Sequence, residues 1–222
     1  GTITVLECLK ELENNCNAIF ITSDKCYENV EWLWGYKETD KLGGKDPYSA
    51  SKAAAEIAIS SYSRTFFSNK KNLKIATTRA GNVIGGGDWA KDRIIPDCIR
   101  SWINKKKVYL RNPSSTRPWQ HVLEPISGYL RLGECMFRGK IFNGESFNFG
   151  PTPFNTKSVE DLVNEMSNYW PKSGYKLQPT KNNFTKEANL LKLNCEKAYE
   201  IINWRPLLEF ETTIKLTAEW YF

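Results

Sequence analysis

The first eighty residues contain a strand pattern, a helix pattern and a second strand pattern, and this order restricts the fold more than any other feature. Residues 18–22 form a short, continuous apolar run, typical of a strand buried in a parallel sheet. Asp46 suits the N-cap of a helix, Pro47 suits its first position, and the helix pattern continues to about Phe67. Residues 73–78 have the composition of the next strand. This βαβ order predicts an α/β fold with a parallel sheet.

Further helix and strand patterns occur along the rest of the chain, with no internal repeat and no low-complexity segment. Residues 26–45 indicate a loop rich in Trp, Tyr and Gly. We expect helices at 2–13, 93–106, 121–136, 158–170 and 212–222, and strands at 108–110 and 146–149.

Composition favours a folded protein and argues against a nucleic-acid partner. The 222 residues are 41% hydrophobic, which is enough to build a core. The net charge is +6, but the basic residues are scattered among 25 acidic ones, so no dense basic stripe points to nucleic acid. A modest basic excess suits an anionic substrate such as a nucleotide diphosphate.

The six cysteines form no C-x-x-C pair and have no zinc-site spacing, so we expect no metal and a reducing compartment. No apolar run approaches the length of a membrane span, and the N-terminus does not have the pattern of a signal peptide. These features predict a cytoplasmic protein with no membrane partner.

Tyr48 and Lys52 lie four residues apart at the start of the predicted helix and therefore share one helix face. An ammonium beside a phenol favours the phenolate, which makes a usable base near neutral pH. A Tyr-x-x-x-Lys pair also arises by chance in a chain rich in lysine. This pair, however, opens a helix that comes after a strand ending in Ser-Asp-Lys, and we take it as a catalytic candidate.

Ser23, Asp24 and Lys25 come directly after the first predicted strand, at the sheet edge where open α/β folds bind their ligands. A polar trio after a strand is also a common turn or cap. Its chemistry is nevertheless specific, because an adjacent carboxyl and amine can serve as acid and base around one substrate carbon. The serine hydroxyl can hydrogen-bond the substrate oxygen.

Residues 81–89 contain a glycine loop that formally fits a dinucleotide fingerprint through Gly85, Gly87 and Ala90. A charged segment comes after it, and no acidic residue lies about twenty positions further on, so we do not assign it to a pyrophosphate. Asn82 is a better ligand candidate because it lies just past a strand end.

Arg117 carries the planar donor group that suits phosphate, and it lies near Trp119 in the sequence. A surface arginine stacked on a structural tryptophan fits the same pattern. His121 is the only histidine, and a satisfied or exposed histidine explains it better than a catalytic one.

Three stretches together resemble the extended short-chain dehydrogenase/reductase superfamily, and within it most closely the CDP-glucose 4,6-dehydratases. They are Thr-Ser-Asp-Lys-Cys-Tyr-Glu-Asn at 22–29, Asp-Pro-Tyr-Ser-Ala-Ser-Lys at 46–52 and Arg-Pro-Trp-Gln-His-Val-Leu-Glu-Pro at 117–125. The similarity extends along essentially the whole chain. Asp-Lys at 24–25 differs from the sugar-nucleotide epimerases, which lack an acidic pair there, and from the dTDP-glucose dehydratases, which carry Asp-Glu.

The resemblance implies an enzyme that uses tightly held NAD and dehydrates CDP-glucose to CDP-4-keto-6-deoxyglucose. Tyr48 would take the proton of the sugar 4-hydroxyl, Ser23 would hold that oxygen, and Lys52 would bind the nicotinamide ribose. Asp24 would protonate the departing C6 oxygen, and Lys25 is the candidate for moving the C5 proton. This chemistry serves deoxysugar biosynthesis, including that of the lipopolysaccharide O-antigen.

The resemblance also implies substrate contacts, a domain division and an oligomer. Asn82, Arg93, Arg117 and Asn148 would bind the nucleotide sugar, with Arg117 on the diphosphate. Residues 1–80 would form the C-terminal half of an NAD-binding Rossmann domain. Residues 81–222 would mainly form a smaller α/β substrate-binding domain, with segments returning to the partial Rossmann-type parallel sheet. A homodimer or higher homo-oligomer would form through the helix that starts at Pro47.

The sequence departs from the family pattern at its N-terminal side. The chain opens inside a helix pattern, and no Gly-x-x-Gly-x-x-Gly loop precedes the first predicted strand, so we expect the N-terminal third of the family to be lacking. A parallel sheet without its first strand would expose apolar edges, so we expect this chain alone to be unstable and inactive. An epimerase or reductase of the same superfamily, and a non-catalytic nucleotide-sugar-binding remnant, are alternative interpretations.

Overall fold

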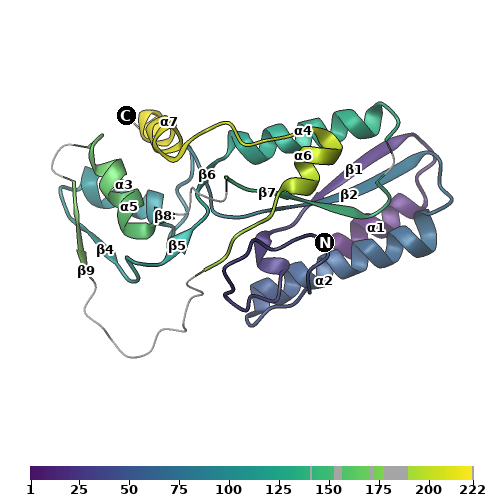
Figure 1. Cartoon of the computed structure of the whole chain (residues 1–222), viewed down its shortest axis with the longest axis horizontal. Coiled ribbons are helices and arrows are strands. Elements are labelled where there is room, and N and C mark those ends of the chain that lie inside the picture. Colours follow the sequence, from purple (N-terminus) through teal and green to yellow (C-terminus); the bar gives the residue numbers. More distant parts are fainter. Residues whose placement is uncertain (141, 153–156, 171–172, 178–189, 222) are drawn as a thin grey trace.

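The computed structural model describes residues 1–140, 142–152, 157–170, 173–177 and 190–221. Figure 1 shows two groups of elements side by side along the long axis. The larger group contains the main sheet and its covering helices, and the smaller group contains short strands and the helices α3, α5 and α7.

The larger group is built on a parallel sheet, as the strand patterns predict. Its strands are β1 (Cys16–Ile21), β2 (Leu73–Ala80) and β7 (Glu145–Phe149), in the order β1-β2-β7. Both pairings are parallel, with Ile19 opposite Ala76 and Thr78 opposite Phe147. Strand β7 therefore brings a late part of the chain next to the first βαβ unit.

Helices cover both faces of this sheet (Figure 1). On one face lie α1 (Thr2–Lys10) and α2 (Pro47–Tyr62), which bury Leu6 and Ile59 against Ile75 of the sheet. On the other face lie α4 (Leu123–Phe137) and α6 (Glu196–Ile202), which bury Met136 and Ile202 against Phe147. This layering is the α/β architecture expected from alternating strand and helix patterns.

Helix α2 begins where its capping residues predict. The Asp46 side chain accepts hydrogen bonds from the Ser49 backbone amide at 3.0 Å and from the Ser49 hydroxyl at 2.6 Å. Pro47 occupies the first turn, where its missing amide hydrogen costs nothing. The α-helix ends at Tyr62 and continues as one π-helical turn, Ser63–Phe67. The start of the helix, which carries Tyr48, is therefore fixed by local chemistry.

The smaller group contains short strand pairs packed on three helices. Its core includes Ile99, Trp102, Leu162, Phe210 and Ile214. The helices are α3 (Ile94–Ile103), α5 (Val159–Ser167) and α7 (Phe210–Tyr221); the strands are β3 (Val83–Ile84) beside β6 (Gln120–His121), β4 (Val108–Leu110) beside β9 (Tyr175–Leu177), and β5 (Thr116–Arg117) beside β8 (Lys157–Ser158).

The sequence patterns miss or misplace several element boundaries. His121 ends strand β6, and helix α4 begins at Leu123 rather than at 121. Helix α6 is absent from the predicted elements, because a segment of seven residues is too short to show a clear period. Helix α5 spans Val159–Ser167, so it ends three residues before the predicted end at 170.

Strand β1 has a single neighbour among the described strands, so its other edge is open. Apolar side chains are exposed near this edge: Ile21 is 60% exposed on β1, and Leu130 is 71% exposed on α4, which packs on β1. At ~25 cal/mol per Å², a few hundred Å² of exposed apolar surface costs several kcal/mol. That cost is comparable to the stability of a whole domain.

We therefore expect the 222-residue polypeptide, expressed alone, to be marginally stable, because apolar surface at the open edge of β1 remains in water. Circular dichroism during heating should show a broad transition or one at low temperature. A sharp, cooperative transition above about 65 °C would contradict this expectation.

Candidate active site

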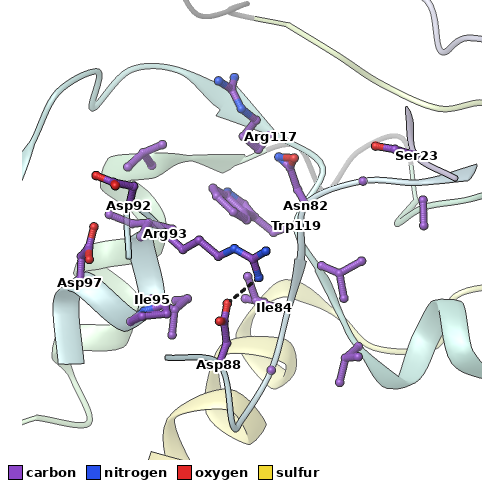
Figure 2. A pocket seen from close by; sticks show the side chains of 18 of the residues that line it. Ser23, Asn82, Ile84, Asp88, Asp92, Arg93, Ile95, Asp97, Arg117 and Trp119 are labelled. Carbon is purple, nitrogen blue, oxygen red and sulfur yellow. Dashed lines mark hydrogen bonds and ion pairs between the residues drawn. The ribbon is translucent and has the colours of Figure 1, made fainter. Parts of the chain in front are cut away.

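The carboxyl ends of β1 and β2 open into a cleft of about 880 Å³ between the sheet and the smaller group. Figure 2 shows Asn82, Arg93, Arg117 and Trp119 around this cleft, with Ser23 on its sheet side. Seven of the nine candidate residues line it: Ser23, Asp24, Lys25, Tyr48, Asn82, Arg93 and Arg117. Chemistry-bearing residues from distant segments thus share one concave site.

Ser23, Asp24 and Lys25 form a capped turn directly after β1. The Ser23 hydroxyl oxygen accepts a hydrogen bond from the Lys25 backbone amide at 3.2 Å, which caps the short 3₁₀ helix Asp24–Cys26. The same hydroxyl donates to Asp24 Oδ1 at 3.0 Å. The turn interpretation of this trio is therefore correct, and the turn also holds all three side chains at the cleft.

Asp24 has an unusual environment for a carboxyl group. It is only 2% exposed, and its Oδ2 has no hydrogen-bond partner among the described residues. Burial raises the pKa of Asp24, and the nearby charges of Lys25 and Arg117 offset this only in part. A carboxyl with a raised pKa retains its proton to higher pH, so Asp24 can act as a general acid.

Gly81 supports Asp24 from the end of β2. A methyl group at position 81 would lie 1.8 Å from Asp24 Oδ2, so only glycine leaves room for the carboxyl in this place. No local pattern in the chain indicates this contact, because residues 24 and 81 are joined only by the pairing of β1 with β2.

Tyr48 and Lys52 lie together on helix α2, at the rim of the cleft. Tyr48 is 53% exposed and lines the cleft. The Lys52 ammonium lies 5.6 Å from the centre of the Tyr48 ring, although Lys52 itself is not among the lining residues. The phenol and the ammonium therefore have the spatial relation that their spacing predicts.

A buried ion pair joins α2 to the sheet, and sequence reasoning missed it. Arg79 Nη2 lies 2.8 Å from Glu56 Oε2, and both side chains are nearly inaccessible. Burial acts to raise the pKa of Glu56, but the hydrogen bond and charge of Arg79 outweigh it, so the pKa is lowered. Two signals were available: Glu56 lies four residues beyond Lys52 on the same helix face, and Arg79 is a charged residue at the end of an apolar strand.

Arg117 and Arg93 bring positive charge to the cleft in different ways. Arg117 is buried and donates through Nη1 to the Thr116 carbonyl oxygen at 2.9 Å, so it is not the exposed surface arginine of the alternative interpretation. Arg93 is exposed and pairs with Asp88 at 2.9 Å, the contact dashed in Figure 2.

Asn82 has a left-handed backbone with φ of 52°, at the turn after β2.

Asn148 is not brought to the cleft, and we withdraw it as a substrate-binding candidate. Its side chain is fully buried and satisfied by protein groups: Oδ1 accepts from the Tyr27 hydroxyl at 2.7 Å, and Nδ2 donates to the carbonyl oxygens of Tyr36 and Asn194. It is a structural residue that ties β7 to the loop after β1. The motif alone could not distinguish these roles.

The glycine loop and His121 both pack against other parts of the protein. A methyl group at Gly86 would lie 2.0 Å from the Trp220 ring, so helix α7 approaches this loop closely. Helix α3 begins only at Ile94, so the loop does not open directly into a helix as a pyrophosphate loop does. His121 is buried, burial lowers its pKa, and its Nδ1 accepts from the Leu123 amide at 3.3 Å.

The family model for GDP-mannose 4,6 dehydratase matches residues 1–217. The chain is 43% identical over 225 residues to CDP-glucose 4,6-dehydratase of Salmonella typhimurium, covering all of this chain and 62% of that protein. It is 25% identical over 241 residues to dTDP-glucose 4,6-dehydratase of Haemophilus influenzae, covering all of this chain and 68% of that protein. The chain thus spans less than two thirds of the first of these relatives.

Solved structures share the fold. The dTDP-glucose 4,6-dehydratase of Bacillus anthracis, in complex with NAD, superposes with a TM-score of 0.80 at 23% identity, covering 99% of this chain and 66% of that one. The UDP-glucuronic acid 4-epimerase of Bacillus cereus gives a TM-score of 0.82 at 17% identity, covering 99% and 65%. At these identities the likeness establishes a Rossmann-like α/β fold and nothing more.

The described residues contain no cluster of three or more His, Cys, Asp or Glu side chains arranged to hold a metal ion. Across the same part of the chain, every helix is too short or too polar to cross a membrane.

Gly81→Ala tests the packing beneath Asp24. The added methyl group must displace the carboxyl, because Oδ2 lies inside contact distance. We expect a loss of about 1–3 kcal/mol in the free energy of unfolding, measured by urea denaturation. Gly133→Ala is the matched control: its methyl group would meet only Ile19 Cδ1, at 3.5 Å, and it should be neutral or slightly stabilising. Equal effects of the two substitutions would show that Gly81 has no special packing role.

Proposed function

The chain belongs to the GDP-mannose 4,6-dehydratase family, and on that premise we propose that it acts in the NAD-dependent 4,6-dehydration of a nucleoside diphosphate glucose. The 43% identity to a CDP-glucose 4,6-dehydratase supports CDP-glucose as the substrate and CDP-4-keto-6-deoxyglucose as the product. The reaction would oxidise C4, eliminate water across C5 and C6, and reduce C6.

The observation that carries the proposal is the buried, incompletely hydrogen-bonded carboxyl group of Asp24. Elimination from C6 needs an acid that is protonated near neutral pH and aimed at the departing oxygen. Asp24 is buried at the cleft, its pKa is raised by burial, and its Oδ2 has no partner among the described residues. A structural aspartate would instead have both oxygens satisfied.

The surrounding residues suit the other proton transfers. Tyr48, exposed at the rim, would remove the proton of the 4-hydroxyl while Ser23 holds the same oxygen. The resulting 4-ketone makes the C5 proton acidic, which explains why oxidation must come first. Lys25 would then take the C5 proton while Asp24 protonates the C6 oxygen, and water leaves.

Tyr48 and Lys52 are the described residues that fit NAD. The Lys52 ammonium, beside the Tyr48 ring at the cleft rim, suits the hydroxyls of a ribose. Bound there, NAD would supply the hydride acceptor for oxidation at C4 and the hydride donor for reduction at C6. Lys52 would also hold its positive charge near the Tyr48 oxygen, which favours transfer of the substrate proton.

The nucleotide would lie toward the smaller group. Arg117 is the candidate for the diphosphate because a guanidinium matches phosphate oxygens in pairs, and Arg93 and Asn82 line the same cleft. The net charge of +6 favours an anionic ligand. The proposal places the reaction in the cytoplasm and in the supply of deoxysugars such as those of lipopolysaccharide O-antigens.

Lys25→Ala tests the proposed chemistry. We expect this chain, expressed together with the N-terminal part that its relatives carry and supplied with NAD, to convert CDP-glucose to a 4-keto-6-deoxy product seen by proton NMR. Lys25→Ala should lower product formation about 10²-fold or more and spare oxidation at C4, detected as NADH absorbance. Lys45→Ala is the matched control, since it removes an exposed lysine outside the cleft lining and should leave turnover unchanged.

Two other results would favour the alternative interpretations. Oxidation at C4 without formation of a 4-keto-6-deoxy product would favour an epimerase or reductase, because neither reaction includes C5/C6 elimination. Binding of CDP without binding of NAD, together with no turnover, would favour a nucleotide-sugar-binding remnant.

A homodimer through helix α2 is part of the proposal. Ile57 of α2 and Phe66 of the adjoining π-helical turn are exposed, as expected for a helix face that packs on a second copy. We expect light scattering to give a dimer mass, and Ile57→Lys to lower it to the monomer mass. Ile103→Lys, a similarly exposed isoleucine on α3, should leave the mass unchanged. A monomer mass for the unmodified protein would contradict the proposed interface.

A further inference from the structure

Helix α2 carries three polar residues at intervals of four: Tyr48, Lys52 and Glu56. Residues at this spacing succeed one another along one side of a helix. Tyr48 reaches the cleft, whereas Glu56 is buried beneath it against the sheet. Helix α2 therefore connects the buried Glu56 carboxylate to the Tyr48 phenol at the cleft.

The Glu56 carboxylate is held by all three strands of the main sheet. Oε2 accepts from Arg79 Nη2 at 2.8 Å and from Thr77 Oγ1 at 2.9 Å on β2, and from Ser146 Oγ at 3.2 Å on β7. Oε1 accepts from Thr22 Oγ1 at 2.5 Å, at the end of β1. In the part of the chain that the structure describes, Thr22 is the partner of Oε1.

Thr22 differs from the other partners in its neighbours along the chain. The next three residues are Ser23, Asp24 and Lys25, whose turn is capped by the Ser23 side chain. The hydrogen bond from Thr22 to Glu56 therefore joins the segment with the candidate acid directly to the helix with the candidate phenol. By contrast, Thr77 lies within β2, where Glu56 Oε2 keeps Arg79 and Ser146 if the Thr77 hydroxyl is removed.

We propose that Thr22 and Glu56 are positioning residues that set the placement of the Ser23–Asp24–Lys25 turn relative to the Tyr48 phenol; the inference rests on the proposed function. Neither residue needs to touch the sugar. Two groups that act on one hexose ring must be held to within a fraction of an ångström, and a misplacement of about 1 Å can lower a rate by 10²-fold. A hydrogen bond between their two supports gives that constraint.

Thr22→Val tests the proposal, because valine keeps the shape of the side chain and removes only the hydroxyl. We expect kcat with CDP-glucose to fall roughly tenfold while KM stays within about twofold, since the substrate-binding arginines are unchanged. Thr22→Ser restores the hydroxyl and should restore kcat. Thr77→Val is the matched control: it removes a hydroxyl that donates to the same carboxylate and should leave kcat within about twofold.

A second measurement is independent of turnover. Hydrogen exchange followed by mass spectrometry reports on the Lys25 and Cys26 amides, which donate to Ser23 Oγ and to the Ser23 carbonyl oxygen. We expect these amides to exchange roughly tenfold faster in Thr22→Val and at the native rate in Thr77→Val. Glu56→Gln is a poorer test, because it leaves Arg79 buried without its counter-charge and can unfold the protein.

The outcomes separate the inference from the proposed function. Equal kcat values in Thr22→Val and Thr77→Val, or equal exchange rates at the 23–26 turn, would reduce Thr22 to a merely structural residue and overturn the inference. If the protein is inert even with the N-terminal part of its relatives in place, the proposed function is refuted, and the exchange rates still decide whether Thr22 holds the turn.

Discussion

The ion pair between Arg79 and Glu56 joins helix α2, which carries Tyr48 and Lys52, to the main sheet beside Asp24. It lies inside the protein, with 2.8 Å between the charged atoms, where α2 packs against the carboxyl ends of β1 and β2 and against Ser146 near the start of β7. Arg79 also donates to the Tyr27 hydroxyl at 2.8 Å, and Tyr27 in turn donates to Asn148 on β7. Removal of one partner of such a pair typically costs about 3–5 kcal/mol, because the other charge remains buried.

Two buried carboxyl groups near this ion pair, those of Glu56 and Asp24, have pKa values shifted in opposite directions because their neighbours differ. Glu56 has a guanidinium and three hydroxyl donors, so its pKa is lowered and it is an anionic anchor. Asp24 accepts one side-chain hydrogen bond, from Ser23, and leaves Oδ2 without a partner among the described residues, so burial raises its pKa. The same functional group thus supplies a fixed support in one place and, in the proposed mechanism, a proton donor in the other.

The two sides of the cleft differ in how their polar residues are held. On the sheet side, the 23–26 turn is fixed by strand pairing, capping and the close approach of Gly81. On the opposite side, Arg93 is exposed and paired with Asp88, while Arg117 is buried in the cleft lining. Polar groups fixed in a concave site with a cationic side are the arrangement that a nucleotide sugar requires.

The sequence by itself determined the features that depend on neighbours in the chain. The parallel sheet, the start of α2 at Asp46 and Pro47, and the juxtaposition of Tyr48 with Lys52 result from periodicity, capping and helix geometry. Only the tertiary structure decided the burial of Asp24, the pairing of Glu56 with Arg79 and the structural role of Asn148. Each of these features depends on a residue from a distant segment that packs beside the side chain in question. A buried polar side chain takes its role from such a partner, and local sequence cannot specify the partner.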